Sequence, residues 1–110
     1  TTFLLTEKGR KRKLRYDLGN IKIPKQKVWD GRWRLLMFDI PESKKFAREA
    51  LRDKLKNLGF LQFQKSIWIY PYPCEDEIDF IAEYFSIAQH LILLTVQIEN
   101  DRPLRAKFKL

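Results

Sequence analysis

A strand-like run of apolar residues covers positions 32–40 and carries one carboxylate, Asp39, close to its end. Side chains of a β-strand alternate between two faces, so Leu36 and Phe38 share one face while Met37 lies on the other. Both faces are largely apolar. This pattern is typical of a strand in the middle of a sheet that is covered on both sides.

Two segments have the spacing of amphipathic helices. In residues 43–58, alanines and leucines recur at helical intervals on one stripe, and Gly59 follows where a helix can end in the left-handed conformation. Residues 75–85 start with three acidic residues, which are favoured at the positive end of a helix dipole, and continue with an apolar stripe. We expect both helices to lie with these stripes against a sheet.

Three further β-type segments follow the first strand, at residues 61–64, 66–70 and 91–98. The order of elements is strand, helix, strand, strand, helix, strand. This order predicts an α+β domain over residues 29–98, with the ferredoxin-like βαββαβ pattern and an antiparallel four-stranded sheet. The flanking parts are expected to be a basic arm and linker at residues 1–28 and a C-terminal tail or extra strand at residues 99–110.

Two helices can cover only one face of such a sheet, yet its first and last strands are apolar on both faces. We therefore predict that the second face binds another copy of the chain in a two-fold homodimer. The residues predicted for this dimer face are Leu35, Met37, Leu91 and Leu93. The alternative is that residues 99–110 fold back over the face, with cover from Leu104, Phe108 and Leu110.

The net charge of +8 comes entirely from the first 34 residues, which hold 11 of the 22 basic residues and 3 of the 14 acidic ones. Residues 35–110 are neutral. The basic residues are densest between positions 8 and 15, at Lys8, Arg10, Lys11, Arg12, Lys13 and Arg15. We predict that these side chains bind the phosphates of DNA, with RNA as the alternative polyanion. The other interpretation is an ordinary solvated tail.

Several classes of protein are excluded by composition. The single cysteine, Cys74, has no partner for an internal disulfide, and together with the single histidine, His90, it offers no zinc-type ligand set. No run approaches the roughly 18 apolar residues of a membrane span, and the N-terminus lacks the apolar core of a secretory signal. We expect a soluble cytoplasmic protein that makes no contact with a membrane.

Asp39 is the candidate for chemistry. A carboxylate at a strand end can hold Mg²⁺ or Mn²⁺, which would polarise a phosphodiester bond, although one carboxylate binds such a metal weakly and a second copy would have to supply another. The favoured alternative is that Asp39 caps the turn through Pro41 or pairs with a cation such as Arg34. For Trp29, Trp33 and Trp68, core packing is favoured over stacking on nucleic-acid bases.

Several motifs give the chain a family resemblance. They are WDGRWR at residues 29–34, FDIPE at 38–42, LGF at 58–60 and QKSIWIYP at 64–71. Together they resemble the central domain of the PaaX family of transcriptional repressors, which is similar to the small CRISPR-associated adaptation nuclease, the Cas-two family. Ahead of them, LLTEKGR at residues 4–10 resembles the last wing strand and following turn of a winged-helix DNA-binding domain.

The resemblance implies a regulator fragment that pairs through its sheet and whose operator binding is relieved by an acyl-coenzyme A effector, without chemistry of its own. In the nuclease relatives, an aspartate at the position of Asp39 in each subunit is taken to hold a divalent metal. The alternative function is therefore a Cas-two-like metal-dependent endonuclease or CRISPR adaptation scaffold, and a third is a toxin-like ribonuclease. Asp39 has no second acid near it on its own strand, which favours the regulator.

Overall fold

Four strands form one antiparallel sheet in the order β2-β3-β1-β4. The computed structural model describes residues 18–110, and its strands are β1 (Trp33–Phe38), β2 (Leu61–Gln64), β3 (Ile67–Tyr70) and β4 (Leu91–Val96). Each helical crossover joins two strands that are separated in the sheet by one other strand. This is the split arrangement of the ferredoxin-like fold, so the predicted fold class is confirmed. The wing-like residues 4–10 lie outside the described residues.

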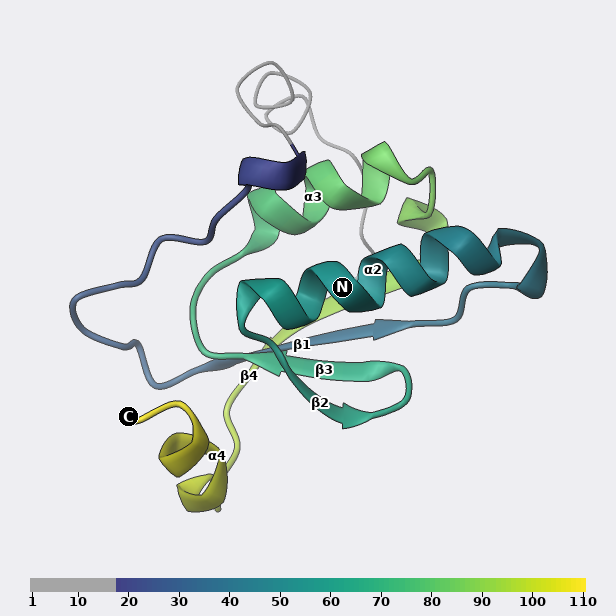
Figure 1. Cartoon of the computed structure of the whole chain (residues 1–110). Helices are drawn as coiled ribbons and strands as arrows, with labels where there is room; N and C mark the ends of the chain where they lie inside the picture. Colours follow the sequence, from purple (N-terminus) through teal and green to yellow (C-terminus); the bar gives the residue numbers. More distant parts are fainter. Residues whose placement is uncertain (1–17) are drawn as a thin grey trace.

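Helices α2 and α3 lie together on one side of the sheet, and α4 lies on the other (Figure 1). The helices are α2 (Lys45–Leu58), α3 (Glu75–Tyr84) and α4 (Arg102–Lys107), and the short 3₁₀ turns are η1 (Leu18–Asn20), η2 (Glu42–Lys44) and η3 (Ala88–His90). None of these helices is long and apolar enough to cross a lipid bilayer. The apolar stripes predicted for residues 43–58 and 75–85 therefore face the same sheet surface.

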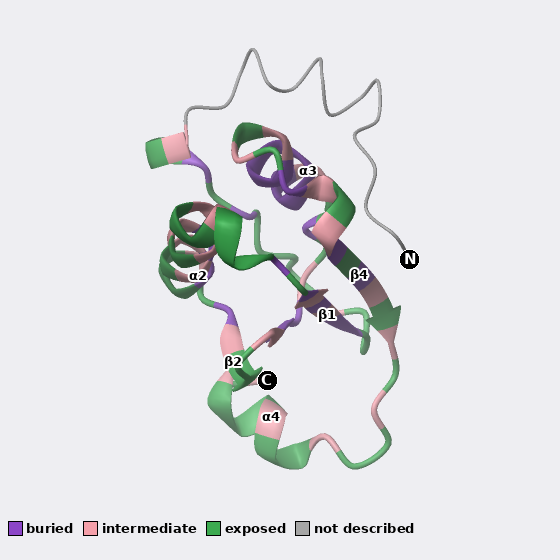
Figure 2. Cartoon of the chain, turned by 90° about the vertical axis from the view of Figure 1, so that its right-hand side faces the viewer, coloured by how far each residue is buried: buried purple, intermediate pink, exposed green. Residues whose placement is uncertain are grey.

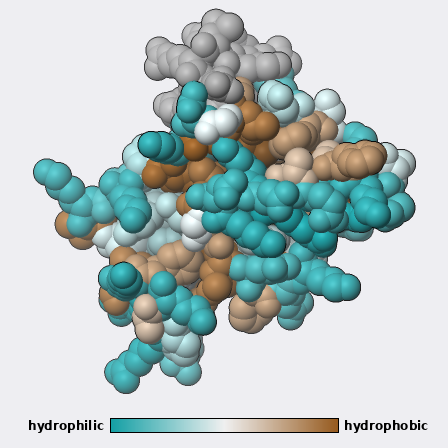
Figure 3. Space-filling view, in the orientation of Figure 1, coloured by the Kyte–Doolittle hydropathy of each residue, from teal (hydrophilic) through white to brown (hydrophobic). Residues whose placement is uncertain are grey.

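Helix α2 ends where the sequence predicts. Gly59 has φ 97°, a left-handed conformation that glycine adopts at little cost, and its N–H donates to the carbonyls of Leu55 and Lys56. Leu51 and Leu55 on the inner stripe of α2 are completely buried, while its outer surface, apart from the exposed Phe46, is mainly hydrophilic (Figures 2 and 3). Only one face of α2 packs against the rest of the protein, and the helix is not buried on all sides.

The sheet face under α2 and α3 carries the main core. Leu36 on β1 lies opposite Trp68 on β3 and Leu93 on β4, and residues opposite each other in a sheet point to the same face. Leu36 and Trp68 have no exposed surface and Leu93 is 7% exposed. These side chains pack with the inner residues of the two helices in one buried cluster.

The opposite sheet surface, here called the open face, is only partly covered. Its half-buried or exposed apolar residues on the three strands β1, β3 and β4 are Leu35, Met37, Ile67, Ile92, Leu94 and Val96. Met37 lies opposite both Ile67 and Ile92, and Ile92 is 41% exposed. The expectation that the helices leave one face of the sheet uncovered is therefore confirmed.

The grouping of Leu91 and Leu93 with Leu35 and Met37 is wrong. Leu91 and Leu93 belong to the buried cluster under the helices, where Leu93 lies opposite Leu36. Both strands have apolar side chains on both faces, so alternation alone does not show which set of β4 residues shares a face with Met37. The pairing register decides it and places Ile92 and Leu94 on the open face instead.

Helix α4 closes one end of the open face. Trp33, which is fully buried, donates its Nε1–H to Asp101 Oδ2 at 2.9 Å, and its ring centroid lies 5.6 Å from that of Phe108. Residues 99–110 thus fold back over the end of the open face that contains Trp33, as the alternative to a dimer predicts. At the other end, Met37 and Ile92 retain exposed surface.

Residues 29–34 form a brace at the start of β1. Arg34 donates through both terminal nitrogens to the Asp30 carboxylate at 3.0 and 2.6 Å, and its Nη1 also donates to the Pro71 carbonyl at 2.7 Å. The Trp29 indole N–H donates to the same carbonyl at 2.8 Å. The brace therefore fixes the start of β1 to the corner that follows β3.

Candidate functional site

The accessible end of the open face contains a hollow of about 380 Å³. Its lining residues are Met37, Phe38, Asp39, Gln89, His90 and Ile92. An apolar floor from Met37 and Ile92 thus lies beside polar groups from the end of β1 and from η3. Apolar centres with polar rims are typical of surfaces that bind another protein.

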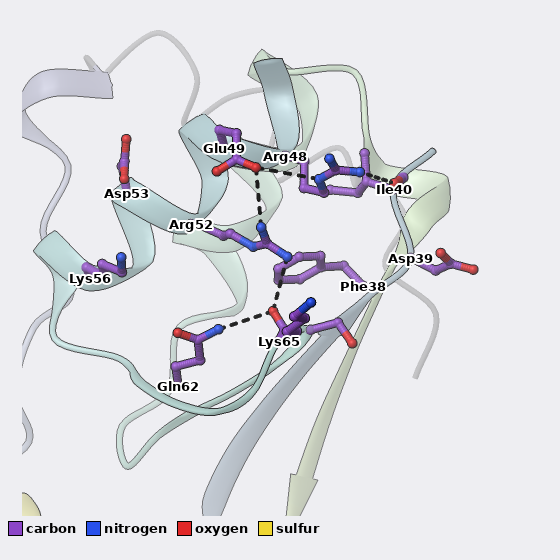
Figure 4. A pocket seen from close by; sticks show the side chains of 11 residues that line it. Phe38, Asp39, Ile40, Arg48, Glu49, Arg52, Asp53, Lys56, Gln62 and Lys65 are labelled. Atoms are coloured by element: carbon purple, nitrogen blue, oxygen red, sulfur yellow. Dashed lines mark hydrogen bonds and ion pairs between the residues drawn. The ribbon is translucent and has the colours of Figure 1, made fainter. Parts of the chain in front are cut away.

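Asp39 lies at the rim of this hollow, just beyond the end of β1. Its backbone N–H donates to the His90 carbonyl at 3.0 Å, which fixes the main chain, while the side chain is exposed. In Figure 4 the carboxylate points away from the arginines of α2. Within residues 18–110 this carboxylate makes no hydrogen bond or ion pair.

Among the residues that the structure describes, neither of the interactions favoured for Asp39 from sequence is formed. Arg34 lies near the start of β1, where it binds Asp30, so an ion pair between Arg34 and Asp39 is excluded by distance along the strand. The turn after β1 is closed by main-chain atoms, since the N–H of Lys44 donates to the Pro41 carbonyl at 2.9 Å. In the described part of the chain, the Asp39 side chain therefore stabilises neither the turn nor the sheet through a hydrogen bond or an ion pair.

The described residues of a single chain do not supply a ligand set for Mg²⁺ or Mn²⁺ around Asp39. Among residues 18–110 no three or more His, Cys, Asp or Glu side chains come together in a way that could hold a metal ion. Hard divalent cations take six or more oxygen ligands, several of them from carboxylates or carbonyls. Residues 18–110 of one copy therefore do not fit such a metal.

A second hollow, of about 680 Å³, lies between α2 and the β2–β3 turn (Figure 4). Its arginines are engaged in bracing the fold: Arg48 Nη1 donates to the Ile40 carbonyl at 3.3 Å and Arg52 Nη2 to the Lys65 carbonyl at 3.5 Å. Both also pair with Glu49. The lining contains four basic and three acidic side chains, so the charges largely cancel.

Cys74 and two of the tryptophans have no accessible surface. Burial is the main cause that raises the pKa of the Cys74 thiol to about 12, with the nearby Glu77 adding to it, so the reactive thiolate is scarce at neutral pH. Trp33 and Trp68 are fully buried and Trp29 is half-buried in the brace. The preference for core packing over base stacking is confirmed for Trp33 and Trp68.

The basic residues of positions 8–15 lie outside the described residues. The chain that follows them remains basic, since residues 18–28 contain Lys22, Lys25 and Lys27 and no acidic residue. All three lysine side chains are exposed. Sequence reasoning treated this stretch as a linker, although its charge pattern already continues that of the preceding segment.

Comparison with protein-family models matches residues 26–108 to the PaaX protein central Cas2-like domain. The chain belongs to the PaaX family. A search of curated proteins finds no match to it. The PaaX match includes the brace at its start and α4 at its end, and in the structure these two regions touch through Trp33, Asp101 and Phe108. The WDGRWR motif that carries the resemblance thus has a structural role in this PaaX domain.

Proposed function

We propose that this chain is the dimerising core, with a DNA-binding arm, of a PaaX-type transcriptional regulator. The observation that carries the proposal is the open face, whose apolar end is left uncovered by α2, α3 and α4 in a chain of this family. The domain itself performs no chemistry. It holds two arms at a fixed separation so that both can contact one DNA duplex.

The open face is suited to a self-complementary contact. Two copies related by a two-fold axis bury the same patch on each partner, so one exposed apolar strip is sufficient for a closed dimer. The strip around Met37 and Ile92 continues into Leu94 and Leu35 along neighbouring strands. Polar groups at its rim, among them Asp39 and His90, would set the register of the pair.

The dimer is tested by sedimentation equilibrium at micromolar concentration. The expected mass is twice the chain mass of 13.3 kDa, and the double variant Met37→Lys/Ile92→Lys should sediment as a single chain. The control is Phe46→Lys, which introduces the same group at an apolar residue on α2 that is 92% exposed and lies outside the strip. A single-chain mass for the unmodified protein would exclude the proposal.

The DNA-binding arm is tested by neutralising Arg10, Arg12 and Arg15 together to glutamine. Basic side chains that contact phosphates release counterions, so the affinity for a 30-base-pair duplex should fall and its dependence on salt should become shallower by about 2 to 3 in log–log slope. Fluorescence anisotropy over a salt series gives both quantities. The same affinity and slope in variant and unmodified protein would mean that the segment is a solvated tail.

We also propose an acyl-coenzyme A thioester as the effector that weakens DNA binding, because this is what membership of the family implies. Addition of the thioester to the protein–DNA complex should release the duplex, whereas coenzyme A without the acyl group should not. If both compounds released the duplex equally, the acyl group would not be required for the effect and this part of the proposal would be wrong.

A metal-dependent endonuclease is the second candidate function. It is favoured by one observation: Asp39 is exposed, has no structural partner within residues 18–110, and lies at the rim of the strip where a second copy would approach. The test is cleavage of single- and double-stranded RNA and DNA with Mg²⁺ or Mn²⁺. Cleavage that disappears in Asp39→Asn would support this function, and its absence in the unmodified protein would exclude it.

A further inference from the structure

A groove of about 450 Å³ lies where the chain enters the domain, between residues 19–25 and the C-terminal half of α2. In Figure 1 the segment after η1 passes the end of α2 on its way to β1. The groove, here called the lysine groove, is lined by Gly19, Ile21, Lys22, Ile23, Lys25, Lys54, Asn57, Leu58 and Tyr70. The entry segment, α2 and the end of β3 thus build one surface.

The segment that forms one wall is anchored, so its lysines are held in place. Ile21 and Ile23 are 4% and 8% exposed and belong to the main buried cluster, while Lys22 between them is exposed. This alternation turns Lys22 outward because its neighbours are packed inward. Lys25 is also exposed, and Lys54 projects from α2 on the other wall.

The charge of the lysine groove is of one sign. Its lining has three lysines and no carboxylate, in contrast to the hollow at Arg48 and Arg52, which mixes both signs. Within residues 18–110 the ammonium groups of Lys22, Lys25 and Lys54 make no hydrogen bond or ion pair. Three unpaired like charges around a shared concavity favour an anion, because binding one relieves their mutual repulsion.

We propose that the lysine groove binds the phosphodiester backbone of the DNA whose contact with the arm is proposed above, so that the domain itself contributes phosphate contacts. Lysine ammonium groups bind phosphates as point charges without fixed geometry, which suits the backbone rather than base edges. The lining of the groove begins at Gly19, shortly after the basic residues 8–15 in the sequence. A duplex that contacts the arm is thereby led to the domain surface beside α2.

The test measures binding of a 30-base-pair duplex by the full chain over a salt series. The triple variant Lys22→Gln/Lys25→Gln/Lys54→Gln should bind more weakly and reduce the log–log salt slope by about 2 to 3, since each lost phosphate contact removes roughly 0.9. The charge-preserving variant with arginine at the same three positions should restore both the affinity and the slope.

The matched control is Lys45→Gln/Lys107→Gln/Lys109→Gln, which lowers the net charge equally at exposed lysines outside the groove. If both triple variants lost the same DNA affinity, the proposed groove site would be overturned, because the loss would then be a general effect of net charge. The groove variant could keep the salt slope while neutralising Arg10, Arg12 and Arg15 abolishes binding. That result would overturn the groove as a DNA site and still support DNA binding by the arm. Unchanged binding in the arm variant, by contrast, would count against the proposed function.

Discussion

The two faces of the sheet are built from the same kinds of residue and yet differ in what they can do. Leu36 and Met37 are neighbours on β1, but Leu36 is completely buried under the helices whereas Met37 lies on the open face with Ile92. The covered face is a core that determines stability. The open face has similar hydrophobicity, but at its Met37 end no element of residues 18–110 covers it, which is why we propose it as the dimer contact.

Two neighbours on β3 that point to opposite faces should show the largest difference in stability. Trp68→Ala should lower the free energy of unfolding by about 3 to 5 kcal/mol, because a large ring is lost from a closed core. Ile67→Ala, on the open face, should cost less than about 1.5 kcal/mol, since the half-buried side chain leaves no enclosed cavity. Urea unfolding at submicromolar protein concentration measures both.

Trp68→Phe is the control for Trp68→Ala. It keeps an aromatic ring and removes an indole N–H that has no hydrogen-bond partner in the described structure, so the loss should be smaller than for alanine. If Ile67→Ala were as destabilising as Trp68→Ala in the single chain, the open face would be a second core and not a binding surface.

The next largest effect is expected at the brace, where the end of the sheet is closed by hydrogen bonds. Arg34 is 6% exposed and binds the Asp30 carboxylate and the Pro71 carbonyl. Arg34→Met should cost about 2 to 3 kcal/mol, because charge-assisted bonds to Asp30 are lost and the Pro71 carbonyl loses one of its two donors. Thermal unfolding provides the measurement, and Arg32→Met, an exposed neighbour, is the control. Equal small losses in the two variants would contradict a bracing role.

The fold could be predicted from the sequence because its signals are local. The helical spacing of residues 43–58, the stop at Gly59 and the proline corner at Pro71 each report the conformation of a short segment. The observed strands differ from the predicted ones by a few residues at their ends, where apolar residues continue past the last paired position. Ile40, for example, is buried yet lies beyond β1.

The composition of each face could not be predicted in the same way. Strand β4 is apolar at nearly every position, so only its register with β1 assigns Ile92 rather than Leu91 or Leu93 to the open face. The lysine groove was missed for a related reason. It combines Lys22 and Lys25 with Lys54 from a different element, and no local pattern relates such positions.

The smallest expected effect is on how stability depends on pH. It arises from the ion pair of Asp30 in the brace. The hydrogen bonds from Arg34 are the main cause that holds the pKa of Asp30 below its usual value of 3.8. A carboxylate with a lowered pKa in the folded state stabilises that state above its unfolded pKa, and the contribution is lost as the pH falls through the folded value. Asp30→Asn should therefore flatten the loss of stability below pH 3.8.

Asp53→Asn provides the comparison for this titration, since it removes one negative charge from an exposed side chain that makes no ion pair in residues 18–110. Thermal unfolding between pH 2.5 and 5 in steps of about 0.5 should give parallel curves for Asp53→Asn and the unmodified protein, with Asp30→Asn converging on them only at the acid end. Because Asp30 is 44% exposed, solvent screens its ion pair and the difference stays modest. Parallel curves for all three proteins would mean that Arg34 braces the sheet through the carbonyls of Arg32 and Pro71 and not through the Asp30 carboxylate.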